Sequence, residues 1–221
     1  TRAGGGAAGR DELDNTEFGV RVRGGYEVSG SITPFADVAV GRRDFDRKVD
    51  SAGLERSSLS GELRGGIIFD FGSRLRGEVA LGYRREDIDD AALEDIDAFV
   101  ADASILWSPR RLTEVRLDLS TDTKPTTLTG ASASILYSGT LTVARRITPR
   151  FRVEVGASID HERFVGADRA DTTYSAFTGV SYAFSRVLSL KASYEYERTE
   201  RGDSSPTTDA NVIGVRLRIQ R

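Results

Sequence analysis

Apolar and polar residues alternate along most of this chain. Between residues 104 and 123, for example, one set of positions is mostly apolar and the other mostly charged: Thr113, Val115, Leu117 and Leu119 against Glu114, Arg116, Asp118 and Ser120. Such alternation predicts β-strands, because successive side chains of a strand point to opposite faces of its sheet. Eleven segments show it, at approximately 16–29, 35–43, 57–71, 74–85, 97–108, 112–121, 132–145, 151–161, 173–184, 187–198 and 210–220. No segment shows a sustained helical period, so the predicted fold class is all-β.

The connections between these segments also alternate, in length. The short ones are GSITP, GS, SPRR, ITPR and SR, and the longer polar ones are RDFDRKVDSAGLER, REDIDDAALED, DTKPTTLTG, HERFVGADRAD and RTERGDSSPTTD. This order is typical of an up-and-down antiparallel meander with all tight turns at one end. Outer-membrane barrels have this arrangement, with short turns in the periplasm and longer loops outside. Greek-key sandwiches do not usually keep such regularity.

Aromatic residues recur near both ends of the apolar face. In a transmembrane barrel this face meets lipid, and aromatic side chains form a girdle at each interface. Trp107 alone fits equally well at the edge of a soluble core; the repetition favours the barrel. The predicted lipid-interface aromatics are Phe18, Tyr26, Phe69, Phe71, Tyr83, Phe99, Trp107, Phe151, Tyr174, Tyr182, Phe184, Tyr194 and Tyr196.

The opposite face carries charges of both signs. In a soluble protein it would be a solvated outer surface, whereas in a membrane barrel it would line a wet lumen. The predicted lumen-facing charges are Arg21, Arg23, Glu27, Glu62, Arg64, Arg76, Glu78, Arg84, Glu114, Arg116, Asp118, Arg152, Glu154, Lys191, Glu195, Arg216 and Arg218.

Composition excludes several other classes of protein. No apolar run exceeds four residues, which excludes a transmembrane helix. The net charge of −3 argues against a nucleic-acid partner, and the absence of cysteine excludes disulfides and thiolate metal sites. The Gly-rich start, residues 1–15, is expected to be a flexible tail or part of a loop, and residues 16–221 to be the barrel.

The number of strands carries a further expectation. Single-chain bacterial barrels have an even number of strands. With short turns in the periplasm, the eleventh strand ends there, so the C-terminus is expected to be periplasmic. The first strand would then start outside, and the full barrel would need twelve strands or more, unless another chain completes the sheet.

Two stretches resemble a known family. They are ASILWSPRRLTEVRLDLSTDTKPTTLTGASASI and the ending SYEYERTERGDSSPTTDANVIGVRLRI. With a Trp before a Ser-Pro turn and a Tyr-x-Tyr penultimate strand, they are similar to the β-barrel porin 2 type of Gram-negative outer-membrane proteins, and the resemblance extends over nearly all of 16–221. It implies a bacterial outer-membrane location, with outer-membrane lipid and lipopolysaccharide as surroundings.

Two constellations suggest chemistry. His161, the only histidine, could serve a hydrolase at the rim, but no serine or carboxylate partner is identifiable in the sequence. The acidic loop with Asp87, Asp89, Asp90 and Glu94 could bind Ca²⁺ loosely, although its spacing is not that of an EF-hand.

Three function classes therefore remain open. A passive narrow pore or structural scaffold, without enzymatic activity or cofactor, leads. A docking subunit of an envelope complex, completed by another chain or by an N-terminal segment, is the alternative, with a homo-oligomer also open. A rim hydrolase using His161 is the third.

Overall fold

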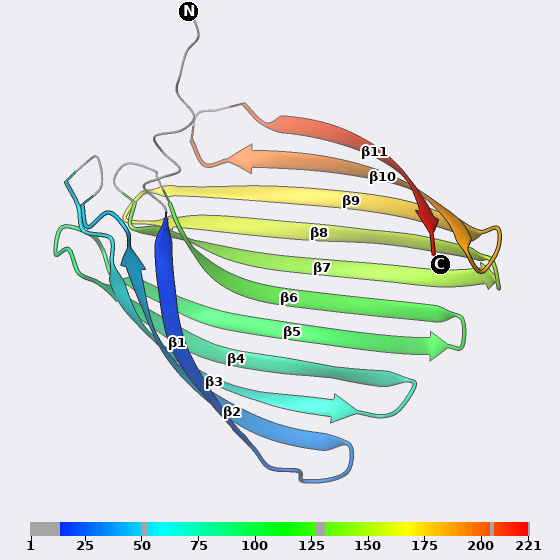
Figure 1. Ribbon diagram of the computed structural model, residues 1–221, viewed down its shortest axis with the longest axis horizontal. Helices are drawn as coiled ribbons and strands as arrows, with labels where there is room; N and C mark the ends of the chain where they lie inside the picture. Colours follow the sequence, from blue (N-terminus) through cyan, green and yellow to red (C-terminus); the bar gives the residue numbers. More distant parts are fainter. Residues whose placement is uncertain (1–13, 50–52, 127–130, 204–205, 221) are drawn as a thin grey trace, which may run out of the picture.

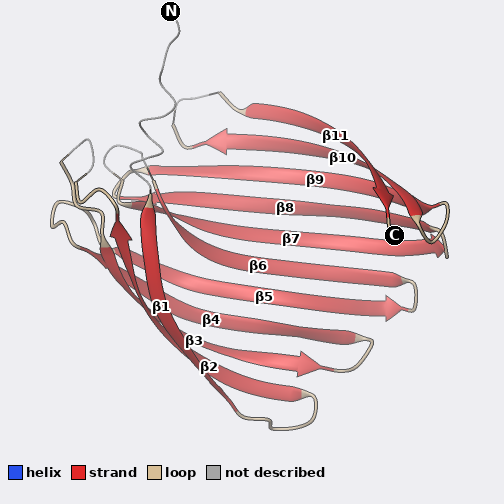
Figure 2. Cartoon of the chain, viewed as in Figure 1, coloured by secondary structure: helices blue, strands red, loops and turns tan. Residues whose placement is uncertain are grey.

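A computed structural model of the protein describes residues 14–49, 53–126, 131–203 and 206–220 (Figure 1). Within these ranges the secondary structure consists of strands without helices, as Figure 2 shows. The strands are β1 (Asn15–Gly25), β2 (Ile32–Phe45), β3 (Ser58–Asp70), β4 (Leu75–Ile88), β5 (Ile96–Arg110), β6 (Thr113–Pro125), β7 (Ala133–Thr148), β8 (Phe151–Val165), β9 (Arg169–Ala183), β10 (Leu188–Arg201) and β11 (Thr208–Ile219). No helix among the described residues is long and apolar enough to cross a membrane.

All eleven strands form one sheet in sequence order, and every neighbouring pair is antiparallel. The predicted all-β, up-and-down architecture is confirmed. The sheet curls strongly, so that β1 passes in front of the middle strands at the left of the view while β11 lies along its upper edge (Figure 1). Within the described residues no backbone ladder joins β1 to β11, and the sheet is open along these two edges. Because the count is odd, β1 and β11 run in the same direction.

The two faces of the curved sheet differ in the way the alternation predicts. Large apolar side chains such as Val20, Leu63 and Leu81 are more than half exposed on the convex face. The concave face instead holds charged side chains with little exposure, among them Asp37 and Glu62. A soluble sheet would bury the apolar face, so the inverted order fits a sheet surrounded by lipid.

The connections gather at the two ends of the strands. The short-connection end holds 26–31, 71–74, 111–112, 149–150 and 184–187; the long-connection end holds 46–57, 89–95, 126–132, 166–168 and 202–207. The five predicted long loops are all wrong in extent, because the flanking strands continue into them; the change is largest for HERFVGADRAD, of which β8 and β9 leave only 166–168 as a connection. The backbone ladder goes on after the apolar residues stop, and Gly166 at φ +85° allows the tight turn.

The N-terminal boundaries need two corrections. Strand β1 ends at Gly25 rather than near residue 29, so Tyr26 and Glu27 lie in the connection to β2, where the Tyr26 amide donates to the Pro34 carbonyl at 3.0 Å. The strand begins at Asn15, one residue before the expected start. The rest of the predicted Gly-rich tail, up to residue 13, lies outside the described residues.

The sheet departs from a simple curl at the long-connection end of β5 and β6. Their ladder stops at Ala103 and Leu119, although both strands continue and pair with their other neighbours. Beyond this point Ile96 and Ala98 of β5 pack in one cluster with Ala133, Ile135 and Val165. The largest fully buried apolar side chains of the described chain, Ile96 and Ile135, lie in this cluster, and burial of each contributes about 1.5–3 kcal/mol.

Candidate functional site

The concave face of β1–β5 carries a network of ion pairs centred on Asp37. This carboxylate is almost fully buried, with 1% of its surface exposed. Its Oδ1 lies 2.8 Å from Nε of Arg23, and its Oδ2 lies 2.8 Å from Nη2 of Arg64 and 3.7 Å from Nη1 of Arg21. One carboxylate from β2 therefore meets three guanidinium groups from β1 and β3.

Glu62 is the second centre of the network. Its Oε1 lies 2.9 Å from Nη2 of Arg21 and 3.1 Å from Nε of Arg64, and its Oε2 lies 2.8 Å from Nη2 of Arg84. Sharing of Arg21 and Arg64 between Asp37 and Glu62 joins the two centres into one unit.

Two further carboxylates complete the network. Oε1 of Glu78 lies 3.0 Å from Arg23, and Oδ2 of Asp102 lies 2.6 Å from Arg64. We call the whole set the central ion-pair network: Arg21, Arg23, Arg64 and Arg84 with Asp37, Glu62, Glu78 and Asp102. Its four cations and four anions cancel. Arg21 and Arg23 remain about 40% and 38% exposed, so water reaches one side of it.

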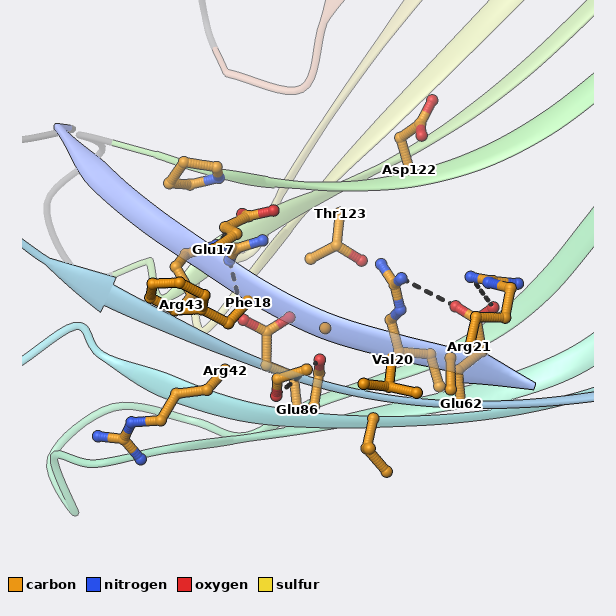
Figure 3. A pocket seen from close by; sticks show the side chains of 17 residues that line it. Glu17, Phe18, Val20, Arg21, Arg42, Arg43, Glu62, Glu86, Asp122 and Thr123 are labelled. Atoms are coloured by element: carbon orange, nitrogen blue, oxygen red, sulfur yellow. Dashed lines mark hydrogen bonds and ion pairs between the residues drawn. The ribbon is translucent and has the colours of Figure 1, made fainter.

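A smaller cluster lies closer to the long-connection end. Arg43 reaches Glu17 at 2.5 Å and Glu86 at 2.8 Å, and Ser58 donates a hydrogen bond to Glu86 at 2.5 Å. Glu17, Arg43 and Glu86 line a cavity of about 440 Å³ together with part of the central ion-pair network (Figure 3). Across the cavity lie Thr123 and the backbone of β6. Residues of β1–β4 and β6 can meet in this way only on the concave side of the sheet.

The remaining predicted charges are spread over the other strands. Arg76 and Arg116 line a separate cavity of about 400 Å³ near the short-connection end, together with Glu78. Three looser pairs lie on β6–β10: Glu114–Arg152 at 3.2 Å, Arg116–Asp118 at 3.9 Å, and Glu154–Lys191 at 3.5 Å. Glu195 lies on β10, and Arg216 and Arg218 lie on the edge strand β11.

The sequence prediction missed Asp37 and Asp102, and it also missed Arg43 and Glu86. A signal was present for Asp37. Val38 and Val40 share the apolar face of β2, so the residue between Ala36 and Val38 must point to the opposite face. Arg43 and Glu86 lie where both faces of the strand carry charge, as the adjacent Arg42 and Arg43 show. Alternation there does not predict which face each side chain is on.

The predicted aromatics divide between the two ends of the strands. Phe18, Tyr83, Phe99, Tyr174 and Tyr196 lie in the halves toward the long-connection end, and Tyr194 lies at the middle of β10. The others lie at or near the short-connection end: Tyr26, Phe69, Phe71, Trp107, Phe151, Tyr182 and Phe184. At the long end, the hydroxyls of Tyr83 and Tyr196 donate to Asp97 and Asp209. Aromatic side chains thus make polar hydrogen bonds at the level where the apolar belt of the convex face ends.

The acidic stretch 87–94 uses its carboxylates in local contacts. Asp87 pairs with Arg85 at 2.7 Å, and Asp89 pairs with Arg42 at 2.9 Å. Oδ1 and Oδ2 of Asp90 accept from the amides of Ala92 and Glu55. In the part of the chain that the structure describes, no group of three or more His, Asp or Glu side chains is arranged to hold a metal ion.

His161 lies near the end of β8. Its Nδ1 is 2.9 Å from the hydroxyl of Thr172, and the neighbouring Asp160 accepts instead from Ser138 at 2.5 Å. Among the described residues no carboxylate hydrogen-bonds to His161, so it lacks the orienting partner of a catalytic triad.

Comparison with known proteins agrees with this geometry. A search of curated proteins found no match. A family model described as putative beta-barrel porin 2 matches residues 2–221. Since the match covers nearly the whole chain, and since the sheet is antiparallel and up-and-down with its apolar face outward, the chain belongs to this family of β-barrel porins.

Proposed function

We propose that this protein is a passive, narrow, water-filled pore of the bacterial outer membrane. The observation that carries the proposal is the central ion-pair network, which gives the concave face a charged and partly hydrated lining. Family membership fits a pore or a scaffold rather than an enzyme. A scaffold needs no such lining, because a closed interior can be filled by packed side chains.

The balance of charges sets the expected selectivity. Four arginines face four carboxylates in the network, so neither cations nor anions gain a strong preference in the lumen. Purified protein in planar bilayers should give ohmic steps of conductance with weak ion selectivity. Folded protein that inserts but conducts no ions would establish the scaffold instead.

The orientation of the barrel belongs to the same proposal. The short connections and the C-terminal strand end lie together, and we place this end in the periplasm. The chain has no cysteine, so single cysteines report cleanly. A membrane-impermeant maleimide should label Ala91→Cys in intact cells, and Ser73→Cys only after the outer membrane is permeabilised. The reverse pattern would invert the orientation.

A second candidate function is supported by the two open edges. In the described chain β1 and β11 have free outer edges and run in the same direction, so a strand antiparallel to both could pair with each. If another chain supplies it, the protein is a docking subunit of an envelope complex. Purification from native membranes should then retain a stoichiometric second polypeptide; its absence would remove this candidate.

A further inference from the structure

At the long-connection end, the outermost residues of β6–β8 fold toward the concave side of the sheet. The evidence is which strand faces meet there. Ile96 and Ala98 share the concave face of β5 with Asp102, whereas Ile135 shares the convex face of β7 with Leu141. In a simply curved sheet these side chains would point away from each other. Instead they form one buried cluster. The end of β7 must therefore lie on the concave side, over β5.

The backbone groups freed by this fold are satisfied where β5 and β6 separate. The hydroxyl of Thr121 accepts from the Ala101 amide at 3.0 Å and donates to the Ala101 carbonyl at 3.2 Å. The Thr121 amide donates to Oδ1 of Asp102 at 3.3 Å, and the other oxygen of Asp102 holds Arg64. The separation is thus built into the structure and is connected to the central ion-pair network.

Arg56 holds the folded end from the other side. It lies in the connection between β2 and β3, and its Nη1 donates to the carbonyls of Ala131 at 3.1 Å and Thr126 at 3.2 Å, with Ser132 at 3.5 Å. Arg163 of β8 adds a hydrogen bond to the Asp97 carbonyl of β5 at 3.5 Å. Contacts from β5 and from the β2–β3 connection therefore fix the same segment.

The folded end narrows the way into the lumen. The 440 Å³ cavity lies between it and the wall of β1–β4, with Thr123 and Pro125 on one side and Arg43 and Glu86 on the other. We propose that residues 121–125, 133–137 and 161–165, held by Arg56, form the constriction that sets the size limit for solutes. This inference rests on the proposed pore function and names the residues that determine its selectivity.

Cysteine cross-linking tests the inward fold without any assay of transport. Three pairs join the meeting faces: Ile96→Cys with Ile135→Cys, Ala98→Cys with Ala133→Cys, and Ile96→Cys with Val165→Cys. At least one should form a disulfide on oxidation in membranes. The control is Ile105→Cys with Leu141→Cys, which share a face two strands apart, about 9–10 Å, beyond the roughly 7 Å that a disulfide spans. Oxidation of the control alone, or of none of the four pairs, would overturn the inward fold.

Conductance then tests whether this fold is the constriction. Arg56→Ala should raise the single-channel conductance and the size of the largest neutral polymer that enters the pore. Arg47→Ala removes an equal charge from an exposed position of the same connection and should change neither. A disulfide with unchanged conductance in Arg56→Ala would overturn the constriction. A disulfide in a protein that never conducts would instead overturn the pore.

Discussion

The hydroxyl of Thr121 replaces a backbone partner for Ala101 at the place where β5 leaves β6. Buried backbone groups seldom remain without a hydrogen bond, and one side chain here satisfies both an amide and a carbonyl. A single side chain, acting as both donor and acceptor, therefore satisfies the backbone of β5 at the point where the two strands separate.

Replacing that residue should loosen the separation. Thr121→Val keeps the shape but removes the hydroxyl, so the Ala101 amide and carbonyl lose their partner at a cost of about 1–3 kcal/mol. The Ala101 amide should exchange hydrogen faster in the variant. Thr121→Ser retains the hydroxyl and is expected to protect this amide as the original residue does; equal protection in Thr121→Val would contradict the assignment.

Asp37 should matter more for stability than any exposed acidic residue. Asp37→Asn leaves three arginines without their shared buried anion, and we expect the free energy of unfolding to fall by about 2–3 kcal/mol. Urea unfolding in lipid vesicles, followed by Trp107 fluorescence, measures this. Asp44→Asn, which removes half of the exposed pair with Arg42, should cost less than about 1 kcal/mol. Equal costs would argue against the network as a stabilising unit.

A single carboxylate-to-amide substitution can shift the charge balance of the lumen. Glu62→Gln leaves four arginines facing three carboxylates, so the pore should become more selective for anions. The reversal potential across a salt gradient reports this, and the shift should shrink as ionic strength rises. Asp87→Asn removes the same charge from the convex side, where it pairs with Arg85, and should leave the reversal potential unchanged.

Gly82 is the position on the concave face where a side chain would collide with the network. A Cβ built there lies 2.9 Å from Cα of Arg64 and also meets the Leu63 carbonyl. Gly82→Ala should therefore displace Arg64 and cost about 1–3 kcal/mol. Gly61→Ala is the matched control, because a Cβ there meets nothing within 4 Å. Thermal unfolding of both variants tests this prediction. If Gly61→Ala is destabilised as well, the cause is the loss of glycine from the strand and not a collision with the network.

Trp107 should report its depth in the membrane. It lies on the convex face near the short-connection end and is 48% exposed, so lipids brominated close to the head group should quench it more than lipids brominated at the chain end. In the variant Leu141→Trp with Trp107→Phe, the tryptophan lies near the middle of β7 and the order should reverse. Lack of quenching by either lipid would exclude contact of this face with lipid.

The alternation of residue types predicted the strands but not the inward fold. Val115, Leu117 and Leu119 give β6 its faces because each strand follows a strict period of two. That period says nothing about where a sheet bends, and Ile135 reads in sequence as one more lipid-facing residue of β7. Its burial depends on contacts with β5, almost 40 positions away, and on the carbonyls that Arg56 reaches.

Alternation predicts the centres of the strands better than their ends. Beyond the apolar belt, β4 continues through Arg85 and Asp87, which pair with each other on one face of the strand. A run of charged residues such as this one predicts a loop. Here Arg85 and Asp87 instead pair with each other two positions apart along the same strand, and the backbone stays in the ladder of the sheet. Glu27 shows the opposite error, because polar alternation runs past the end of β1 into the turn.

The order in which this chain acquires its structure follows from its contacts. Every backbone ladder among the described residues joins strands adjacent in sequence, so hairpins can be added one after another with short loops to close. The hydrogen bonds from Arg56 to the β6–β7 connection span 70 to 76 positions. They need β3 to β7 in place first, so the narrowing of the lumen would be a late step of assembly, with a wider precursor before it.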